Sequence, residues 1–250
     1  MTFSAISEAG ILRSRDLQNA GDFQRYWNHV DLLCLPKRKN PRYVVGFACS
    51  DRALELTLRL RYEVFNVELG EGLAESHATG LDQDIYDRQM THLVLAESAT
   101  GQIIGAYRLQ TVRQAIEGAG LYSEQEFDLS PLAPYFQAAV ECGRACIARE
   151  HRSPATVLLL WNGIAEFLRL HGHRWLFGCC SLTSTDPDDG WRALKTLRAK
   201  NFLHPELFLA PQPDFSCGGA EREHDPALGD PIRLPKLFGA YMRLGSRVIS

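Results

Sequence analysis

Two opposite charges stand inside an apolar segment of this chain that otherwise has the composition of a buried strand. The segment reads Ala139-Val140-Glu141-Cys142-Gly143-Arg144-Ala145-Cys146-Ile147-Ala148. A charged group that leaves water without a partner is strongly destabilised, so we expect Glu141 and Arg144 to be paired, hydrogen-bonded or lining a polar cleft. Any fold that contains this strand must therefore supply polar partners close to its core.

Four other charged residues are placed where they could join that pair in one polar network. Arg61 follows apolar positions spaced as on a helix, and Arg108 interrupts an apolar run typical of a strand. Asp84 and Asp87 flank an Ile-Tyr pair just before another predicted strand. Arg61 could also be a solvated helix residue, and the two aspartates could be turn-formers.

Composition narrows the class of protein without naming it. The chain has 250 residues, of which 45% are hydrophobic and 23% charged, so one large domain, or one domain with an extension, is expected. A net charge of -3 gives no support to nucleic-acid binding. Seven cysteines without a repeated CxxC spacing favour reduced thiols over disulfides or a metal site.

Neither a membrane span nor a signal sequence is predicted. The longest candidate span, residues 157–168, is interrupted by Asn162, Gly163 and Glu166. The N-terminus lacks a charged segment followed by an apolar one. We therefore expect a cytoplasmic protein.

The order of predicted elements indicates an α/β fold. Residues 1–40 are interpreted as an N-terminal extension that ends in a basic linker between prolines, and 41–250 as one domain. The predicted strands span 42–48, 92–97, 103–111, 139–148, 174–182 and a piece near 241–249. The predicted helices span 51–65, 155–171 and 188–200. This order favours a mixed sheet with helices on both faces.

Several motifs, in their order and spacing, resemble one family over about residues 55–248. They are Leu60-Arg61-Tyr62-x-Val64-Phe65, Asp84-Ile85-Tyr86-Asp87, His92-Leu93-Val94-Leu95, Gly105-Ala106-Tyr107-Arg108-Leu109, Tyr122-x-x-x-x-Phe127-x-Leu129, Glu141-x-Gly143-Arg144-Ala145-Cys146, Leu159-Leu160-Trp161-x-Gly163-Ile164 and Phe177-Gly178-Cys179-Cys180-Ser181-Leu182. The chain is similar to the N-acyltransferases of ornithine-lipid synthesis. These belong to a GNAT-like superfamily with the long-chain N-acyl amino acid synthases and the acyl-homoserine-lactone synthases.

The resemblance implies a GNAT-like (acyl-CoA N-acyltransferase) fold and an N-acyltransferase reaction. A long-chain fatty acyl group, with or without a 3-hydroxyl, would move from a phosphopantetheine thioester to the α-amine of an amino acid. Ornithine is the first expectation for the acceptor, and tyrosine or glycine are the alternatives. The segment Leu237–Gly245 resembles the family's C-terminal strand. Relatives usually continue beyond it, so we expect a shortened protein or a continuation past Ser250.

Glu141 and Arg144 are the expected catalytic residues, with Glu141 as the proton acceptor for an amine that is protonated at neutral pH. Burial would raise the pKa of Glu141 and Arg144 would lower it. Strand alternation places the two residues on opposite faces, unless Gly143 marks a bulge that re-aims one of them. In the superfamily such a bulge opens a gap beside the next strand, where pantetheine amides bind. The alternative is a structural ion pair that fixes the register of the sheet.

The same resemblance assigns roles to the other charges. Arg61, Asp84, Asp87 and Arg108 become an acceptor-binding or cleft network, in which carboxylates and guanidinium groups could hold both ends of a zwitterionic acceptor. No metal ion and no bound cofactor is implied. The acyl donor is a co-substrate.

Arg149, Arg152 and Ser153 are expected to bind phosphopantetheine, because they precede a predicted helix whose first N–H groups favour a phosphate. Coenzyme-A-dependent relatives carry a Gly-rich loop there, whereas this chain has arginine and proline. A single phosphate, and so acyl carrier protein rather than acyl-coenzyme A, is favoured. The acidic carrier protein needs a basic dock, for which Lys195, Arg198 and Lys200 are further candidates, unless they form a solvated helix face.

An alternative from another class is a non-catalytic module that binds acyl chains or carrier protein. Such a module would not need the whole charged network, and substitution of Glu141 by Gln separates the two interpretations. An acylated product would partition into lipid, so peripheral contact with the inner face of the membrane is expected.

Overall fold

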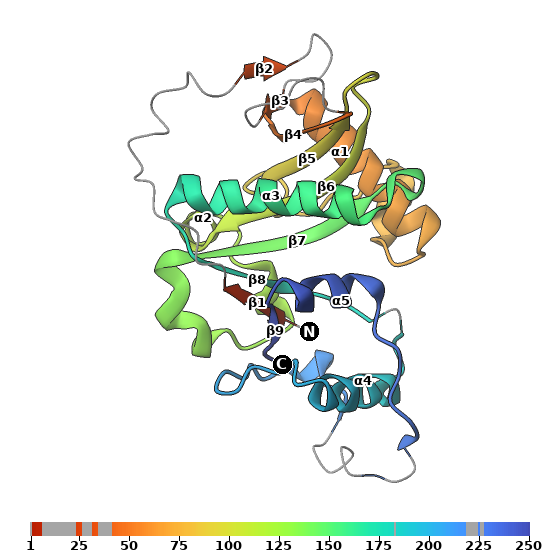
Figure 1. The fold of residues 1–250 in the computed structure, drawn as a ribbon, viewed down its shortest axis with the longest axis vertical. Coiled ribbons are helices and arrows are strands. Elements are labelled where there is room, and N and C mark those ends of the chain that lie inside the picture. The colour runs from red at the N-terminus through yellow and green to blue at the C-terminus, as the bar shows by residue number, and fades with distance from the viewer. Residues whose placement is uncertain are drawn as a thin grey trace. The chain divides into compact units, whose positions relative to one another are not determined.

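The computed structural model describes residues 42–182, 184–218, 225 and 228–250, together with the backbone of three short strands nearer the N-terminus (Figure 1). It divides into two compact units. Unit 1 comprises Met1–Glu8, Gly120–Glu141 and Arg174–Ser250, and unit 2 comprises Ala9–Ala119 and Cys142–His173. The predicted extension, residues 1–40, lies outside the described residues except for the backbone of those strands.

Unit 2 contains a sheet in the order β2-β3-β4-β5-β6-β7, in which each consecutive pair from β2 to β6 is antiparallel. Its strands are β2 (Gln24–Tyr26), β3 (Leu32–Cys34), β4 (Tyr43–Ala48), β5 (Thr91–Glu97), β6 (Ile103–Thr111) and the residues of β7 (Ala139–Ile147) from Cys142 onward. All nine residues of β6 are buried. Such a strand must be covered on both faces.

Two helices of unit 2 cover opposite faces of this sheet, which confirms the predicted layers (Figure 1). Helix α1 (Asp51–Tyr62) packs with Val94 and Ala106 through its apolar side chains. Helix α3 (Pro154–His171) contacts the alternate positions, Leu93 and Gly105. Because successive side chains of a strand point to opposite faces, the two helices lie on different sides.

The start and end of α1 follow from its sequence. The hydroxyl of Ser50 accepts a hydrogen bond from the Ala53 N–H, as expected of an N-cap. The helix then continues into a π-helical turn, η1 (Glu63–Glu68), and a 3₁₀ turn, η2 (Ala74–Ala78). Between these turns Gly72 lies so close to Asn66 that a Cβ atom there would come within 1.9 Å of its side-chain oxygen. A short helix, α2 (Val112–Glu117), follows β6.

Unit 1 contains the strand order β7-β8-β1-β9. Residues 139–141 of β7 run parallel to β8 (Trp175–Cys179), whereas β8 is antiparallel to β1 (Thr2–Ile6) and β1 is antiparallel to β9 (Arg247–Val248). The sheet is therefore mixed, as predicted. Its helices are η3 (Tyr122–Gln125), η4 (Ser130–Ala138), α4 (Pro187–Ala199), η6 (Pro213–Phe215) and α5 (Lys236–Arg243).

The C-terminal segment differs from the sequence-based prediction. Of the strand expected near 241–249, the first three residues belong to the helix α5, and only Arg247–Val248 forms a strand. Its buried side chains are Phe238, Tyr241 and Met242, a spacing that places them on one face of a helix. Burial of that face decides the conformation, and the resemblance to a family strand at Leu237–Gly245 was wrong at this point. None of the helices among the described residues has the length and apolarity that crossing a membrane requires.

Candidate active site

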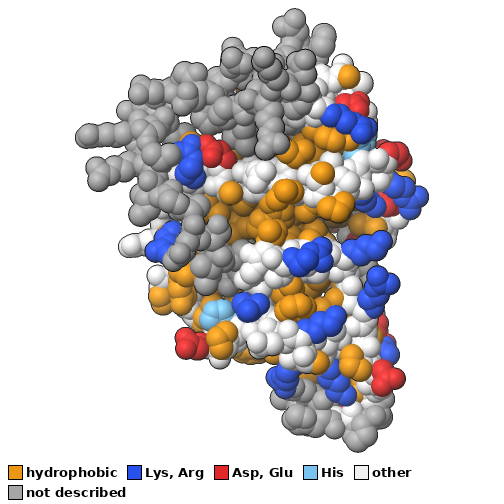
Figure 2. Space-filling view, viewed as in Figure 1, with side chains coloured by type: hydrophobic (Ala, Val, Ile, Leu, Met, Phe, Trp, Pro, Cys, Tyr) orange, Lys and Arg blue, Asp and Glu red, His pale blue; other side chains and the backbone are white. Residues whose placement is uncertain are grey.

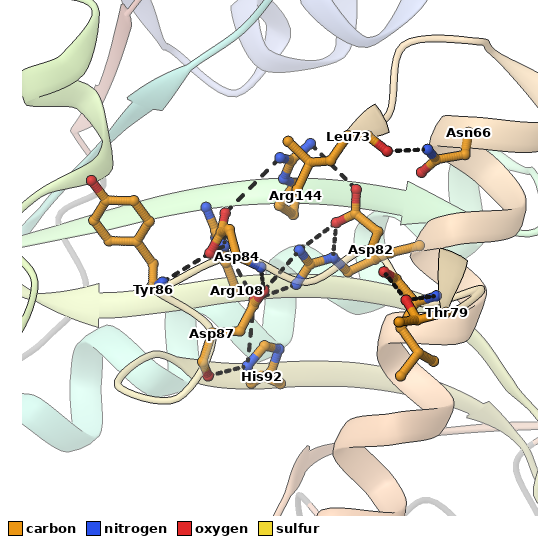
Figure 3. A network of polar contacts seen from close by, with 12 residues as sticks. Asn66, Leu73, Thr79, Asp82, Asp84, Tyr86, Asp87, His92, Arg108 and Arg144 are labelled. Carbon is orange, nitrogen blue, oxygen red and sulfur yellow. Dashed lines mark hydrogen bonds and ion pairs between the residues drawn. The ribbon is translucent and has the colours of Figure 1, made fainter. Parts of the chain in front are cut away.

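Figure 3 shows a charged network in unit 2 that includes Asp82, Asp87 and Arg144. The centre of this network is Arg61, in the last turn of α1. Its Nε donates to Asp82 Oδ1 at 2.9 Å, and its Nη1 donates to Asp87 Oδ1 at 2.5 Å. All three side chains are buried. The Asp82 N–H donates to the Leu58 carbonyl of α1 at 3.1 Å, which holds the Asp82 carboxylate beside the guanidinium. Arg61 is therefore a core residue and not a solvated one.

Arg108 extends the network from the middle of β6. Its Nη1 lies 2.6 and 2.7 Å from the two carboxylate oxygens of Asp84 and 3.1 Å from Asp87 Oδ1. The same aspartates also shape their own loop, because Asp84 accepts from the Tyr86 N–H and Asp87 accepts from the Asp84 N–H. The two aspartates therefore form the turn and also contact the arginines of the network, whereas their role in binding an acceptor stays a prediction.

The pKa values of the network follow from burial and from its ion pairs. Burial would raise the pKa of Asp87, but Arg61 and Arg108 outweigh it and lower that pKa to about 2. Burial would likewise lower the pKa of Arg61, but Asp87 and Asp82 raise it above its ordinary value. His92, whose Nε2 lies 2.9 Å from the Asp87 carbonyl oxygen, has a pKa lowered mainly by burial. At neutral pH Asp87 is thus ionised and His92 is neutral.

Arg144 reaches this network from β7 through an unusual backbone conformation. Its φ angle is +50°, in the left-handed region that costs a side-chain-bearing residue about 1–2 kcal/mol. The irregularity predicted at Gly143 thus lies one residue further along. The guanidinium lies 3.6 Å from Asp82 Oδ2, 3.9 Å from Asp84 Oδ2 and 5.5 Å from the centre of the Phe65 ring.

Glu141 has a different environment, in unit 1. Its carboxylate is buried and accepts hydrogen bonds from the Tyr122 N–H at 3.0 Å, the Ser123 N–H at 2.7 Å and the Ser123 hydroxyl at 2.6 Å. Glu141 has polar partners within unit 1, and Arg144 has polar partners within unit 2. The expectation that each charge is compensated is confirmed.

Ser123 links Glu141 to a thiol. The Cys179 Sγ donates to the Ser123 hydroxyl oxygen at 3.4 Å, and that hydroxyl donates to Glu141. Burial raises the pKa of Cys179 to about 12, so the thiol stays protonated at neutral pH. The chain of donors therefore points from the thiol, through the hydroxyl, to the carboxylate.

The three residues expected to bind phosphopantetheine lie together in unit 2, between β7 and α3. Arg152 forms a two-pronged pair with Glu68, with nitrogen–oxygen distances of 2.6 and 2.7 Å, and Arg149 Nε lies 3.4 Å from the same carboxylate. The hydrogen bond from Arg152 lowers the pKa of Glu68. A phosphate would therefore have to compete with a carboxylate for these guanidinium groups.

Ser153 is the N-cap of α3. Its hydroxyl accepts from the Thr156 N–H at 3.2 Å, and the Thr156 hydroxyl accepts from the Ser153 N–H at 3.0 Å. Pro154, the first helical residue, has no N–H. Most of the donors that a helix start offers to an anion are thus already used or missing.

Sequence reasoning missed three residues that the structure places in these groups: Asp82, Ser123 and Glu68. Asp82 could have been found, because it precedes Asp84 and Asp87 in the loop that leads to β5. Ser123 and Glu68 lie 18 and 84 residues from their partners Glu141 and Arg152, so no local pattern marks them. Within the part of the chain that the structure describes, no group of three or more His, Cys, Asp and Glu side chains could hold a metal ion.

Comparison with known proteins assigns the fold and the family. The family model for the acetyltransferase (GNAT) domain matches residues 60–162. The L-ornithine N(alpha)-acyltransferase of Rhodobacter capsulatus is 34% identical in an alignment 216 positions long, which covers 82% of this chain and 82% of its own. The enzyme of that name from Agrobacterium fabrum is 30% identical over 77% of this chain and 73% of its own. The AHL synthase LasI, a solved structure, is 13% identical with a TM-score of 0.43, over 66% of this chain and 80% of its own.

The curated relatives carry the assignment, since the match extends over most of both sequences. It includes the β5, β6, β7 and α3 region that the GNAT family model spans. The chain has the GNAT fold and belongs to the L-ornithine N(alpha)-acyltransferase family of acyltransferases.

Proposed function

We propose that this protein transfers a long-chain fatty acyl group from acyl carrier protein to the α-amine of ornithine. The observation that carries the proposal is the 34% identity to an L-ornithine N(alpha)-acyltransferase over 82% of both chains. In the reaction the α-ammonium of ornithine first loses one proton, and the resulting amine nitrogen bonds to the thioester carbon. The carbon–sulfur bond then breaks, the nitrogen loses a second proton, and the pantetheine sulfur takes up one proton and leaves as a thiol. The protein must accept a proton from the attacking nitrogen and must stabilise the charge on the thioester oxygen, for which backbone N–H groups are suited.

Glu141 is the proposed proton acceptor, acting directly or through a water molecule. Two backbone N–H groups and one hydroxyl keep its carboxylate oriented without a cation among those partners. The same bonds also fasten the turn η3 to β7, so a structural contribution accompanies the chemical one. Substitution of Ser123 separates the two, because it removes one of these bonds and keeps the carboxylate.

Direct attack by the amine is favoured over an acylated cysteine. Burial raises the pKa of Cys146, Cys179 and Cys180 to about 12 in each case. A thiol with such a pKa contains almost no thiolate at neutral pH, and the thiolate is the nucleophile. In the proposed reaction the acyl group therefore passes directly to the amine and not through any of these three thiols.

Two features favour acyl carrier protein as the proposed donor. They are the capped N-terminus of α3 and the basic surface of unit 1. The capping of α3 by Ser153 leaves few N–H groups for a pyrophosphate, whereas arginines suit a single phosphate. Figure 2 shows lysine and arginine side chains gathered where Figure 1 places α4 and α5. The basic residues of these helices and their ends include Lys195, Arg198, Lys200, Lys236 and Arg243. Such a surface complements an acidic carrier protein.

The product sets the proposed place of action. An N-acylated amino acid with a long chain is amphiphilic and partitions into lipid. We place the reaction in the cytoplasm, with peripheral contact at the inner face of the membrane. Co-sedimentation of the full chain with anionic vesicles, before and after acylation of the acceptor, measures this contact.

The direct test uses the purified full chain with acyl carrier protein carrying long acyl or 3-hydroxyacyl groups. A pool of amino acids that includes ornithine, tyrosine and glycine is supplied, and N-acyl products are identified by mass spectrometry. We expect one dominant product, N-acylornithine, which is lost in Glu141→Gln and kept in the exposed control Glu117→Gln. A dominant product with another amino acid overturns the choice of acceptor, and no product from either acyl carrier protein or acyl-coenzyme A overturns the proposed function.

A further inference from the structure

Arg144 is bonded differently from the other two arginines of the network. The hydrogen bonds of Arg61 and Arg108 to carboxylates include several of 2.5 to 3.1 Å. The guanidinium of Arg144 makes no hydrogen bond to a described residue, and its two ion pairs measure 3.6 and 3.9 Å. These distances exceed the usual range of a charge-assisted hydrogen bond, about 2.7–2.9 Å.

Two buried atoms of this ion pair lack a hydrogen-bond partner among the described residues. Among the described residues, neither the Arg144 Nε nor the Asp82 Oδ2 has a hydrogen-bond partner. Buried polar groups in native proteins are nearly always hydrogen-bonded, and an unbonded one needs an explanation such as a missing ligand. The left-handed φ of Arg144 adds a backbone strain, which persists only where the surroundings hold the residue in place.

Exposure separates the members that a ligand can reach from those that it cannot. The side chains of Arg144 and Asp84 are each 15% exposed, whereas those of Asp82 and Asp87 are fully buried. Arg61 and Arg108 are also buried and are engaged by the aspartates. The accessible edge of the network therefore consists of one guanidinium and one carboxylate, which lie 3.9 Å apart.

We propose that Arg144 binds the α-carboxylate of the acceptor amino acid and that Asp84 binds its side-chain ammonium. The inference deepens the proposed function and rests on it. Three arginines and three aspartates balance one another in the network, so a ligand that brings one anion and one cation keeps the balance. Ornithine then leaves its α-amine as the group that is not held by this pair. The guanidinium, which lacks hydrogen bonds, gains the two-pronged contact with a carboxylate for which its geometry is suited.

The test compares two acceptors, L-ornithine and L-ornithinamide, which differ in the carboxylate charge. Arg144→Asn removes the guanidinium and keeps a residue that tolerates a left-handed φ. We expect the ratio of kcat/KM for ornithine to that for ornithinamide to fall about 10- to 100-fold in this variant, since a hydrogen bond to a charged group has that effect. Arg144→Lys should lose less of the ratio, and Arg113→Asn, at an 85% exposed side chain, should keep it.

A second pair of acceptors, L-ornithine and L-norvaline, tests the proposed contact between Asp84 and the side-chain ammonium. Norvaline lacks the ammonium of ornithine, so Asp84→Asn should lower the preference for ornithine over norvaline and leave the preference over ornithinamide nearly unchanged. The Asp84 and Arg144→Lys variants also keep the test decisive if Arg144→Asn does not fold, as judged by its circular dichroism.

The outcomes separate this inference from the function on which it rests. A wild-type protein that acylates no amino acid overturns both. A wild-type protein that acylates ornithine, with folded and active Arg144 and Asp84 variants whose acceptor preferences are unchanged, overturns only the inference. If the variants lose turnover equally for all acceptors and keep the acceptor preferences of the wild type, the two residues have a structural role. That result also overturns the inference.

Discussion

Buried carboxylates are stabilised in two different ways in this protein. In unit 2, Asp82 and Asp87 are neutralised by guanidinium groups. In unit 1, Glu141 is held by neutral donors, two of them backbone N–H groups. Charge pairing fixes several side chains at once and is costly to break, whereas neutral donors orient a carboxylate whose charge stays available to a substrate. The first arrangement suits a scaffold and the second suits a proton acceptor.

The largest expected effect comes from breaking the charge-paired environment. Arg61→Met leaves Asp82 and Asp87 buried without their main counter-charge, so we expect the free energy of unfolding to fall by about 3–5 kcal/mol. Urea denaturation at neutral pH measures it. Arg59→Met, two residues away with a 53% exposed side chain paired to Glu55, should cost less than about 1 kcal/mol. Equal losses of stability in the two variants would show that the buried network stabilises the fold no more than the exposed Arg59–Glu55 pair does.

The neutral-donor environment should respond more in activity than in stability. Glu141→Gln places an amide among donors and should lower the free energy of unfolding by about 1–3 kcal/mol, with turnover reduced at least 100-fold. Ser123→Ala should cost about 1 kcal/mol and keep most of the turnover. Thermal unfolding and single-turnover acyl transfer give the two quantities. Similar turnover losses in both variants would contradict the role of Glu141 as the proton acceptor.

The charge-paired environment should also make the stability of the protein depend on pH. The pKa of Asp87 is about 2 in the folded protein and 3.8 ordinarily, which corresponds to roughly 2 kcal/mol. Because the folded-state pKa is lower, this stabilisation is present above about pH 4 and is lost as the pH falls towards 2. His92 acts in the same direction from about pH 6.5 downward, since its lowered pKa makes the unfolded state bind the proton first. Urea midpoints between pH 7 and 3, in wild type and Asp87→Asn, measure this; a stability that does not fall with acid would refute it.

The smallest expected effect concerns Glu68. Glu68→Gln weakens the pairs with Arg152 and Arg149 at the protein surface, so stability should change by less than about 1 kcal/mol. If the released arginines bind the donor phosphate, KM for acyl carrier protein should fall a few-fold while kcat stays constant. Glu71→Gln, at an exposed position nearby in sequence, serves as the control. A KM that rises or stays unchanged would argue against a phosphate at these arginines.

Sequence patterns predicted most of the elements that support the site. The alternation and apolar character of residues 92–97 and 103–111 place β5 and β6 within one residue of their bounds, and the predicted helices 51–65 and 155–171 overlap α1 and α3. The segment after Pro235 was mistaken for a strand, because its helical face is defined by what buries Phe238 and Tyr241. Short apolar stretches do not distinguish the two conformations by themselves.

The sequence by itself determined that charges in strands must be compensated, and by resemblance it determined the family. It could not determine which charge meets which, because the answer depends on side chains brought together from distant segments. Asp82 lies beside Arg61 because its loop is hydrogen-bonded to α1. Arg144 lies near Asp82 because its own backbone adopts a left-handed φ inside the strand β7. Pairing energies act over a few ångströms, so only the tertiary structure could choose Asp82 for Arg144 and Ser123 for Glu141.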